Sequence, residues 1–384
     1  MLRKRWVVEP RRLVKILCAI VVTVLAATLG PVVRLQAAEY YVSTLGSDQN
    51  SGKRDEPLQT IPRASELAKP GDIVYVLPGT YEGGFVTRSN GTAANRITYA
   101  SAVKWQAKIA PPRISSSDTG WENQGNYVDI LDFQVDGTNN SGGQAWFVGV
   151  EDASSNSRII GNWIHHIKAP CNHNGGAGIN AYQWKGNLNT SIIGNVVHDI
   201  GDVVGGCPWV HGIYHQHSGL IINNLVFRAG GWGIHLWHKP HDITISNNTV
   251  FNNKRGGIVI GGEPSEISGY PGDIIVVNNI VYDNPIGVGE EGLTSANNQY
   301  IANMVYSNRV DWKLQNNILP ARSVTADPRF VRYDPDGGGD YRLSDTSPAI
   351  DAGVSGYAAA TDILGITRPQ GSGIDIGAYE FCCR

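Results

Sequence analysis

Three histidines and one tyrosine crowd into the segment WVHGIYHQHSG, residues 209–219, where they could bind a metal or transfer a proton. Imidazole titrates near neutral pH, so histidine can act as a general base and as a metal ligand. Whether these side chains can bind one metal ion depends on which of them lie on the same face of a helix or a strand. On a helix His211 and His215 would converge, whereas on a strand His215 and His217 would share a face.

The segment belongs to a repeat, which favours strands. Six segments share an asparagine flanked by β-branched residues, and its successive spacings are 33, 29, 24, 31 and 24 residues. The six are Asn162, Asn195, Asn224, Asn248, Asn279 and Asn303. The first five are each followed by a glycine pair: Gly178-Ile179, Gly212-Ile213, Gly233-Ile234, Gly257-Ile258 and Gly287-Val288. Units of this length with three short strands, none able to bury its face alone, are typical of a parallel β-helix.

The shared asparagine is expected at a sharp bend of each coil. Asparagine tolerates left-handed backbone, and its amide can bond to the equivalent asparagine one coil away. An antiparallel sandwich, the alternative fold, would also give frequent turns but not this column. We therefore predict parallel coils with an asparagine column at one corner.

Both ends of the chain resemble β-helix proteins. Residues 39–83, EYYVSTLGSDQNSGKRDEPLQTIPRASELAKPGDIVYVLPGTYEG, resemble the opening of secreted right-handed parallel β-helix proteins related to polysaccharide lyases. Residues 327–353 and 361–381 resemble the C-terminal segment of bacterial β-helix proteins labelled choice-of-anchor Q. The resemblance implies an all-β, right-handed, single-stranded parallel β-helix of the pectin-lyase-like type, with a short N-terminal capping helix. It is weak for the reaction, since such coils also occur in hydrolases, epimerases and non-catalytic surface proteins.

Four segments are expected along the chain. Residues 1–38 have the layout of a signal peptide: basic residues, an apolar stretch from Ile16 to Leu29, and then small residues. This predicts export to the periplasm, the cell surface or the medium, with no stable membrane span after processing, although an uncleaved anchor stays open. The other three are an N-terminal cap with the first strands (39–94), the coils (95–320) and a C-terminal closing segment (321–384). We expect a monomer.

Charge narrows the choice of partner. Without residues 1–38 the chain has 24 basic and 33 acidic residues, a formal charge of −9. Nucleic acid is therefore not expected as a partner, because phosphate binding draws on a basic surface. An acidic polysaccharide is still allowed if basic side chains gather in one groove.

The register of the coils predicts which histidines point inward and which point outward. If the residue after each glycine points inward, alternation places Tyr214 and His235 outward on neighbouring coils. Trp237 then also faces outward, and His215 faces the core above Ala181. A slip of one residue would exchange the two faces.

The outward residues suggest an acid–base site for β-elimination on a uronate-containing polysaccharide. Tyr214 and His235, with His211 nearby, would act on the acidic C–H and the leaving oxygen, while a cation neutralises the carboxylate. Candidate substrate-binding residues are Trp237, Arg228, Lys254, Arg255 and Lys168. The plainer reading also stays open: Tyr214 and His235 as surface residues, Trp237 as a packing residue, and Lys254 with Arg255 as a polar turn.

Three classes of function remain open. The leading one is a polysaccharide lyase. A glycoside hydrolase would need two carboxyl groups about 5 to 10 Å apart, for which Asp202, Glu290 and Glu291 are candidates; a uronan epimerase is a further enzyme on this fold. The third class is a non-catalytic glycan-binding or surface-structural protein.

No metal site is predicted. His211 and His215 would converge only on a helix, and His215 and His217 have no third ligand on a strand, so His215 and His217 are doubtful site residues. Asp202, a candidate carboxylate for the hydrolase alternative, is also doubtful. Calcium stays open as a cofactor because it is common among the lyases that the chain resembles. The acidic run DPDGGGD, residues 334–340, is more typical of a turn than of a calcium loop.

Two cysteines are expected to pair. Cys171 and Cys207 occupy equivalent loops of successive coils, so in an oxidising compartment they could form a disulfide beside the groove. No pairing is predicted for Cys382 and Cys383, which are adjacent in the tail.

Overall fold

The computed structural model of the chain describes residues 37–112, 117–138, 145–171, 175–183, 186–201, 207–263 and 273–382. The apolar stretch of the expected signal peptide and Asp202 lie outside these residues. Among the described residues, the helices are too short or too polar to cross a bilayer.

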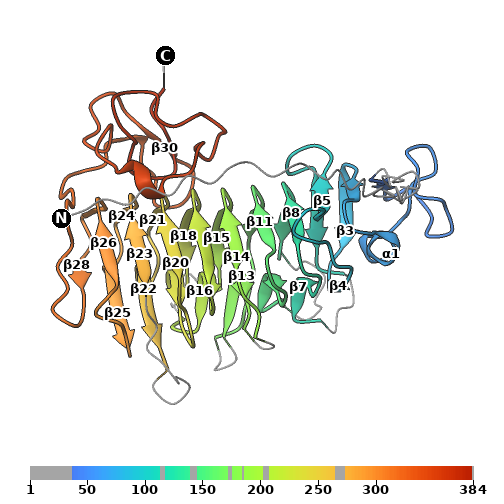
Figure 1. Cartoon of the computed structure of the whole chain (residues 1–384), viewed down its shortest axis with the longest axis horizontal. Helices are drawn as coiled ribbons and strands as arrows, with labels where there is room; N and C mark the ends of the chain where they lie inside the picture. The colour runs from blue at the N-terminus through green and yellow to red at the C-terminus, as the bar shows by residue number, and fades with distance from the viewer. Residues whose placement is uncertain are drawn as a thin grey trace, which may run out of the picture. The chain divides into compact units, whose positions relative to one another are not determined.

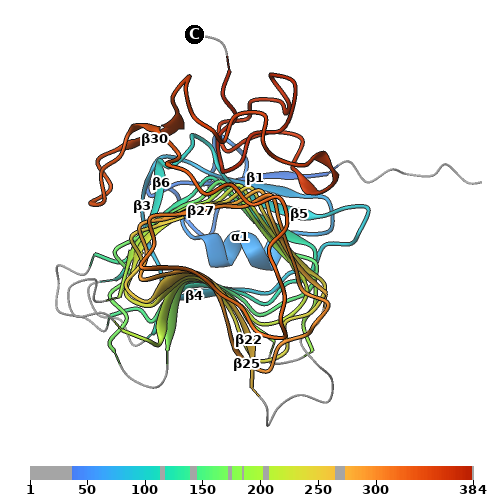
Figure 2. The ribbon, with the colours of Figure 1, turned by 90° about the vertical axis from the view of Figure 1, so that its left-hand side faces the viewer.

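Three parallel sheets wind into a β-helix (Figures 1 and 2). Each coil contributes one strand to sheet 1, then one to sheet 3, then one to sheet 2. Sheet 1 contains β1 (Glu39–Val42), β2 (Ile73–Val76), β5 (Ile97–Ser101), β8 (Val128–Leu131), β11 (Arg158–Ile160), β14 (Thr190–Ile193), β17 (Gly219–Ile222), β20 (Ile243–Ser246), β23 (Ile274–Val277) and β26 (Gln299–Ile301).

Sheets 2 and 3 complete the coils. Sheet 2 contains β4 (Phe85–Thr87), β7 (Thr119–Asn123), β10 (Val148–Asp152), β13 (Gly176–Ala181), β16 (Val210–His215), β19 (Trp232–Leu236), β22 (Gly256–Gly262), β25 (Ile286–Gly292) and β28 (Val310–Lys313). Sheet 3 contains β3 (Gly79–Glu82), β6 (Ala107–Ala110), β9 (Gln134–Asp136), β12 (Trp163–His165), β15 (Val196–Ile200), β18 (Leu225–Ala229), β21 (Thr249–Phe251), β24 (Ile280–Tyr282) and β27 (Met304–Tyr306). The coils begin with β2 to β4, earlier than the expected residue 95.

The predicted coil register is confirmed in sheet 2. The residues after the repeated glycines pair with one another from coil to coil, and all are fully buried. They are Ile179, Ile213, Ile234, Ile258 and Val288. Their side chains meet those of sheets 1 and 3 in one continuous apolar core. Burial of this stacked column fixes the register, because a slip of one residue would turn it to solvent.

The asparagine column is also confirmed, at the corner between sheets 1 and 3. Asn195 donates its backbone N–H and its side-chain amide to Oδ1 of Asn224, at 2.9 and 3.0 Å. Asn224 makes the same two bonds to Asn248, both at 2.9 Å, and the pattern runs from Asn162 to Asn303. The whole column is buried. The ladder thus satisfies polar groups that would otherwise be stranded in the core.

The backbone role expected for these asparagines was wrong. The left-handed conformation belongs to the residue before each of them, such as Asn223, Asn247 and Asn278, with φ of 57°, 54° and 55°. The column asparagine itself turns inward and closes the ladder. A second ladder, of Asn253, Asn284 and Asn308, stands at the corner between sheets 3 and 2.

The expected capping helix is present. Helix α1 (Ile61–Leu67) begins at Thr60, whose hydroxyl accepts a hydrogen bond from the backbone N–H of Arg63 at 3.2 Å. Ile61 and Ala64 are buried against the first coils. The helix lies at the N-terminal end of the coils (Figure 1) and covers their first strands, which would otherwise be an open sheet end.

Only the first part of the C-terminal segment lies at the last coil, where Ala321 pairs with Ile301 of β26 and Val324 pairs with Met304 of β27. The rest of the segment runs back along the outside of the coils (Figures 1 and 2). It contains an antiparallel hairpin, β29 (Phe330–Arg332) and β30 (Asp340–Leu343), and a 3₁₀ turn, η1 (Ser355–Tyr357). The aromatic rings on the outer face of sheet 3 explain this position: Phe227, Phe251 and Tyr282 pack against the segment's Phe330, Tyr333 and Tyr341.

Candidate active site

The structure brings four of the predicted residues together on the outer face of sheet 2. The rings of Tyr214 and His235 stack with centroids 5.1 Å apart, and the rings of His211 and His235 lie 4.0 Å apart. Trp237 adjoins His235 at 5.7 Å. We call these four residues the imidazole cluster. They meet because β16 and β19 are neighbours and Tyr214 pairs directly with His235.

Hydrogen bonds orient the two histidines. Nε2 of His211 lies 2.8 Å from Nδ1 of His235, and Nδ1 of His211 accepts the backbone N–H of Trp232 at 3.3 Å. Since Nδ1 of His211 is an acceptor, its proton is assigned to Nε2, which donates to His235. His235 then has its own proton on Nε2. His211 is therefore a positioning residue, and His235 presents an N–H donor.

Burial keeps both imidazoles neutral. Desolvation, followed by the positive charge of Arg255, lowers the pKa of His211 to about 3. The pKa of His235 is lowered well below its usual value, first by desolvation and then by His211 and Arg255. Neither ring is charged near pH 7. The cluster is also less open than predicted: His211 is buried, and Tyr214 and His235 are half-buried.

The predicted substrate-binding cations lie in different places on the coils. Arg255 lies at the edge of the cluster, 5.9 Å from the Trp232 ring, and forms an ion pair with Glu291 at 3.1 Å. Lys254 and Lys168 are exposed. Arg228 is not brought to the cluster: it lies on sheet 3, where its guanidinium pairs with Asp199 at 2.6 Å and with Asp336 of the C-terminal segment. Its expected role beside Tyr214 is therefore wrong.

Trp237 lies over the glycines of the next two coils. A Cβ at Gly261 would stand 2.5 Å from its indole ring, and one at Gly292 would stand 2.9 Å away. The glycines thus provide the space in which the half-buried ring lies beside His235.

Substituting Gly261 by alanine should displace the indole. We expect Gly261→Ala to weaken binding of neutral and charged glycans alike, by about tenfold, because the methyl group occupies the place of the ring. The same methyl group would stand 2.5 Å from the backbone oxygen of Glu291, so the fold of the variant is checked by circular dichroism. Isothermal titration with oligosaccharides measures the binding. Gly356→Ala, where a Cβ meets nothing within 4 Å, is the control. Unchanged binding in Gly261→Ala would remove Trp237 from the glycan site.

The doubtful histidines are core residues. His215 is fully buried and pairs with Ala181, as the register predicted, and its Nε2 lies 3.1 Å from the carbonyl oxygen of Thr190. His217 is buried beside it, with ring centroids 4.8 Å apart. Desolvation lowers the pKa of His215 to about 4 and that of His217 to about 3. Both rings therefore pack as neutral groups in the core.

Of the carboxylates proposed for a hydrolase, the two in the described part of the chain, Glu290 and Glu291, do not form a pair across a groove. Glu290 faces the interior, opposite Ile260, and accepts hydrogen bonds from Tyr300 at 2.7 Å and Asn298 at 2.8 Å. Glu291 is held by Arg255, and Asp202 lies outside the described residues.

A different pair of carboxylates was missed. Glu122 and Glu151 pair with each other and with Asn180 along the outward column that leads to Tyr214. Burial, followed by repulsion from Glu122, raises the pKa of Glu151 to about 7, although Asn180 donates to it at 3.0 Å. The signal was readable in the sequence, because Gly120 and Gly149 precede this pair as the repeated glycines precede the others.

Two further predictions concern the loops. Cys171 and Cys207 form the predicted disulfide, with Cα atoms 5.4 Å apart. The run at 334–340 is the predicted turn, between β29 and β30. Its carboxylates face arginines: Asp336 pairs with Arg228 and Asp340 with Arg342 at 2.5 Å.

Comparison with known proteins agrees with the architecture. Residues 44–85 match a family model described as a protein of unknown function, DUF1565. The uncharacterized protein YwoF of Bacillus subtilis (strain 168) is 32% identical over 78 residues, which cover 20% of this chain and 17% of that protein. The chain thus matches less than a fifth of this curated relative's length.

Solved structures show the fold. Pectate lyase Pel9A superposes with a TM-score of 0.59 at 18% identity, covering 90% of this chain and 97% of that one. The A-module of mannuronan C-5 epimerase AlgE6 from Azotobacter vinelandii gives 0.53 at 18% identity, covering 68% and 69% of the two chains. The chain is therefore an all-β protein with a pectate-lyase-like parallel β-helix.

Proposed function

We propose that the chain is a secreted polysaccharide lyase that cleaves a uronate-containing polysaccharide by β-elimination. The observation that carries the proposal is the 2.8 Å contact between His211 and His235 beside the stacked Tyr214 ring, on the outer face of a lyase-like fold. The disulfide between Cys171 and Cys207 supports an oxidising compartment. The names of the two structural relatives, a pectate lyase and a mannuronan epimerase, agree with an acidic glycan.

The roles follow from the geometry. Elimination removes the C5 proton, builds negative charge on the uronate carboxylate and releases an alkoxide. Tyr214, in its deprotonated form, would accept the C5 proton and then return it to the departing oxygen, while the Nε2–H of His235 donates a hydrogen bond that stabilises the negative charge on that oxygen. Arg255 would bind the carboxylate, and its attraction grows as charge develops in the transition state. Arg255 must then be shared with Glu291, its partner at 3.1 Å.

A panel of acidic and neutral polysaccharides tests this proposal. A lyase gives an unsaturated uronate whose conjugated double bond absorbs in the ultraviolet, while new reducing ends form in equal number. Reducing ends without the chromophore would indicate a hydrolase. Tight binding with neither product would leave two cases, which nuclear magnetic resonance of the recovered glycan separates. An inverted C5 centre would indicate an epimerase, and an unchanged glycan would indicate a non-catalytic glycan-binding protein.

Glu122 and Glu151 favour hydrolysis as the second candidate. The two residues are direct partners on adjacent strands, which lie about 4.8 Å apart. Side chains that start from this backbone spacing can bring two carboxyl groups to the roughly 5 Å found in retaining glycosidases. A pKa of about 7 suits Glu151 to proton transfer near neutral pH.

Glu151→Gln should stabilise the protein at alkaline pH. The folded-state pKa of Glu151, about 7, lies above its ordinary value of 4.5, so its favourable contribution is present below pH 4.5 and is lost as pH rises through 7. We therefore expect a higher melting temperature than wild type at pH 8 and little difference at pH 4. Thermal melts at the two pH values measure this, with the exposed Glu82→Gln as control. A lower melting temperature for Glu151→Gln at pH 8 would contradict a buried, repelled carboxylate.

A further inference from the structure

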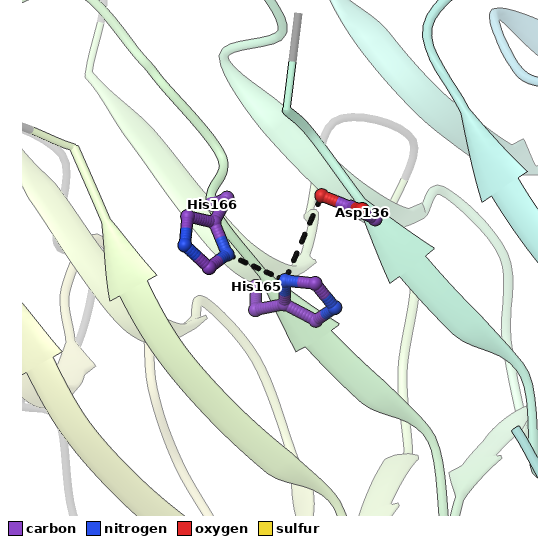
Figure 3. Close-up of side chains that lie close together, drawn as sticks. All are labelled: Asp136, His165 and His166. Atoms are coloured by element: carbon purple, nitrogen blue, oxygen red, sulfur yellow. Dashed lines mark hydrogen bonds and ion pairs between the residues drawn. The ribbon is translucent and has the colours of Figure 1, made fainter. Parts of the chain in front are cut away.

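A second cluster of titratable side chains lies on another face of the coils, on sheet 3. Asp136 ends β9, His165 ends β12, and the two residues are direct partners on adjacent strands. Nδ1 of His165 lies 3.6 Å from Oδ1 of Asp136 and 2.6 Å from Nδ1 of His166 (Figure 3). One ligand atom from each residue lies within 4.8 Å of the others. Asp136 and His165 are buried, whereas His166 is exposed.

The backbone at His166 makes this arrangement. Consecutive residues of a strand face opposite sides, so two adjacent histidines would normally diverge. His166 has φ of 55°, in the left-handed region, which turns its ring back toward His165. The same corner of the next coil has Asp199 at φ of 53°, which likewise meets its neighbour His198, at 2.6 Å. The bend is therefore a property of the fold, but in this coil it joins two imidazoles to a carboxylate.

We propose that Asp136, His165 and His166 bind one divalent transition-metal ion of the zinc type, through one carboxylate oxygen and the two Nδ1 atoms. Two ring nitrogens 2.6 Å apart must share a single proton, and a metal can replace that proton. Tetrahedral zinc, with ligands at about 2.0 Å, needs ligand atoms roughly 3.3 Å apart. The observed distances from Nδ1 of His165 are 3.6 Å to Oδ1 of Asp136 and 2.6 Å to Nδ1 of His166, one above and one below this value. A small movement of the exposed His166 would therefore bring the three ligand atoms to tetrahedral spacing.

The surroundings fit a metal with one open position. Nε2 of His165 lies 2.9 Å from the amide nitrogen of Gln134. With Nδ1 on the metal, the Nε2–H needs an acceptor, which the Gln134 side chain supplies through its amide oxygen once the amide group is turned over. His198 is not a ligand, because Nε2 accepts from Trp163 at 2.8 Å and Nδ1 contacts Asp199. Three protein ligands leave a fourth position for water or a ligand oxygen beside the exposed ring of His166.

Lys108 competes with the metal. Its ammonium pairs with Oδ2 of Asp136, while the backbone N–H of Thr138 donates to Oδ1 at 2.9 Å. Oδ1 retains a second lone pair for the metal. The lysine's charge repels a cation, so its removal should tighten binding.

Equilibrium dialysis of the untagged, full-length protein against Zn²⁺ tests the proposal. We expect about one zinc per wild-type chain, at least about tenfold weaker binding in His166→Ala and in Asp136→Asn, and tighter binding in Lys108→Met. Zinc should also raise the melting temperature of wild type but not that of His166→Ala. His241→Ala, which removes a half-buried histidine outside this cluster, is the matched control and should bind like wild type.

Three outcomes would overturn the site. One is binding that His166→Ala and Asp136→Asn leave intact. Another is loss of zinc in His235→Ala alone, which would assign the ion to the imidazole cluster on sheet 2. The third is no stoichiometric binding in the wild type.

Cobalt substitution gives a separate readout, because a four-coordinate site with nitrogen and oxygen ligands has visible absorption bands that His166→Ala should lose. The metal site does not depend on the lyase proposal.

Discussion

Replacing His235 by alanine should lower turnover on a uronate-containing polysaccharide by about 10²- to 10³-fold, the usual range for loss of one preorganised hydrogen-bond donor to an oxygen that gains negative charge. The loss should appear in kcat more than in KM, because the donor stabilises charge that develops only in the transition state. Turnover of the Tyr214→Phe variant should fall by a similar factor. His235→Gln should recover part of the rate, since an amide N–H can replace the imidazole donor.

The measurement is the initial rate of chromophore formation on the glycan that the panel identifies, with each variant's fold checked by circular dichroism. Arg255→Ala should mainly raise KM for charged glycans, and His241→Ala should match wild type. Near-normal rates in both Tyr214→Phe and His235→Ala would refute the assignment and turn attention to Glu151. Loss of chromophore formation in Glu151→Gln alone would place the chemistry at the carboxylate pair.

Replacing Asn224 by alanine should lower the free energy of unfolding by about 4 kcal/mol. The substitution removes two bonds accepted from Asn195 and three that the side-chain amide donates. These three go to Oδ1 of Asn248 and the carbonyl oxygen of Ile192, both at 2.9 Å, and to the carbonyl oxygen of Ile222 at 3.1 Å. All of these groups lie inside the coils, where each stranded donor or acceptor costs about 1 to 3 kcal/mol. The penalties of the separate stranded groups are not fully additive. The expected loss of about 4 kcal/mol is therefore smaller than the sum of the single penalties.

Denaturant unfolding followed by tryptophan fluorescence measures this loss. The control is Asn189→Gly, which removes an exposed hydrogen bond to Asn156 at 2.9 Å, while glycine accommodates the φ of 66°. We expect this control to lose less than about 1 kcal/mol, because water replaces the partner. Equal losses in the two variants would mean that the buried ladder adds nothing beyond ordinary hydrogen bonds.

The architecture was predictable because its signal repeats. Each coil supplies another asparagine and another glycine pair, so the repeat alone is sufficient to place the inward column of Ile213 and its equivalents. That register also places Tyr214 beside His235 and His215 in the core. Local alternation and strand spacing are sufficient for these statements, since parallel neighbours differ by one coil only.

Contacts between distant parts of the chain could not be read in this way. Arg228 was assigned to the site from its place in a loop, but its partner Asp336 is 108 residues away. Glu151 lies before the first repeated asparagine, Asn162, so the glycine pairs that follow the asparagines, from Gly178 onward, do not include it. The ring of His166 turns toward His165 because of one backbone dihedral, which residue alternation does not predict.

The position of the C-terminal segment has a consequence for how the coils come apart. Asn223, Asn247 and Asn278 stand on three successive coils, and their amides donate to carbonyl oxygens of the segment at 2.6, 2.9 and 2.8 Å. A stack whose coils touch only their neighbours can unravel one coil at a time from an end. Here the coils joined by the segment must separate from it together, so they should melt as one cooperative unit, and unravelling should start from the end that carries α1.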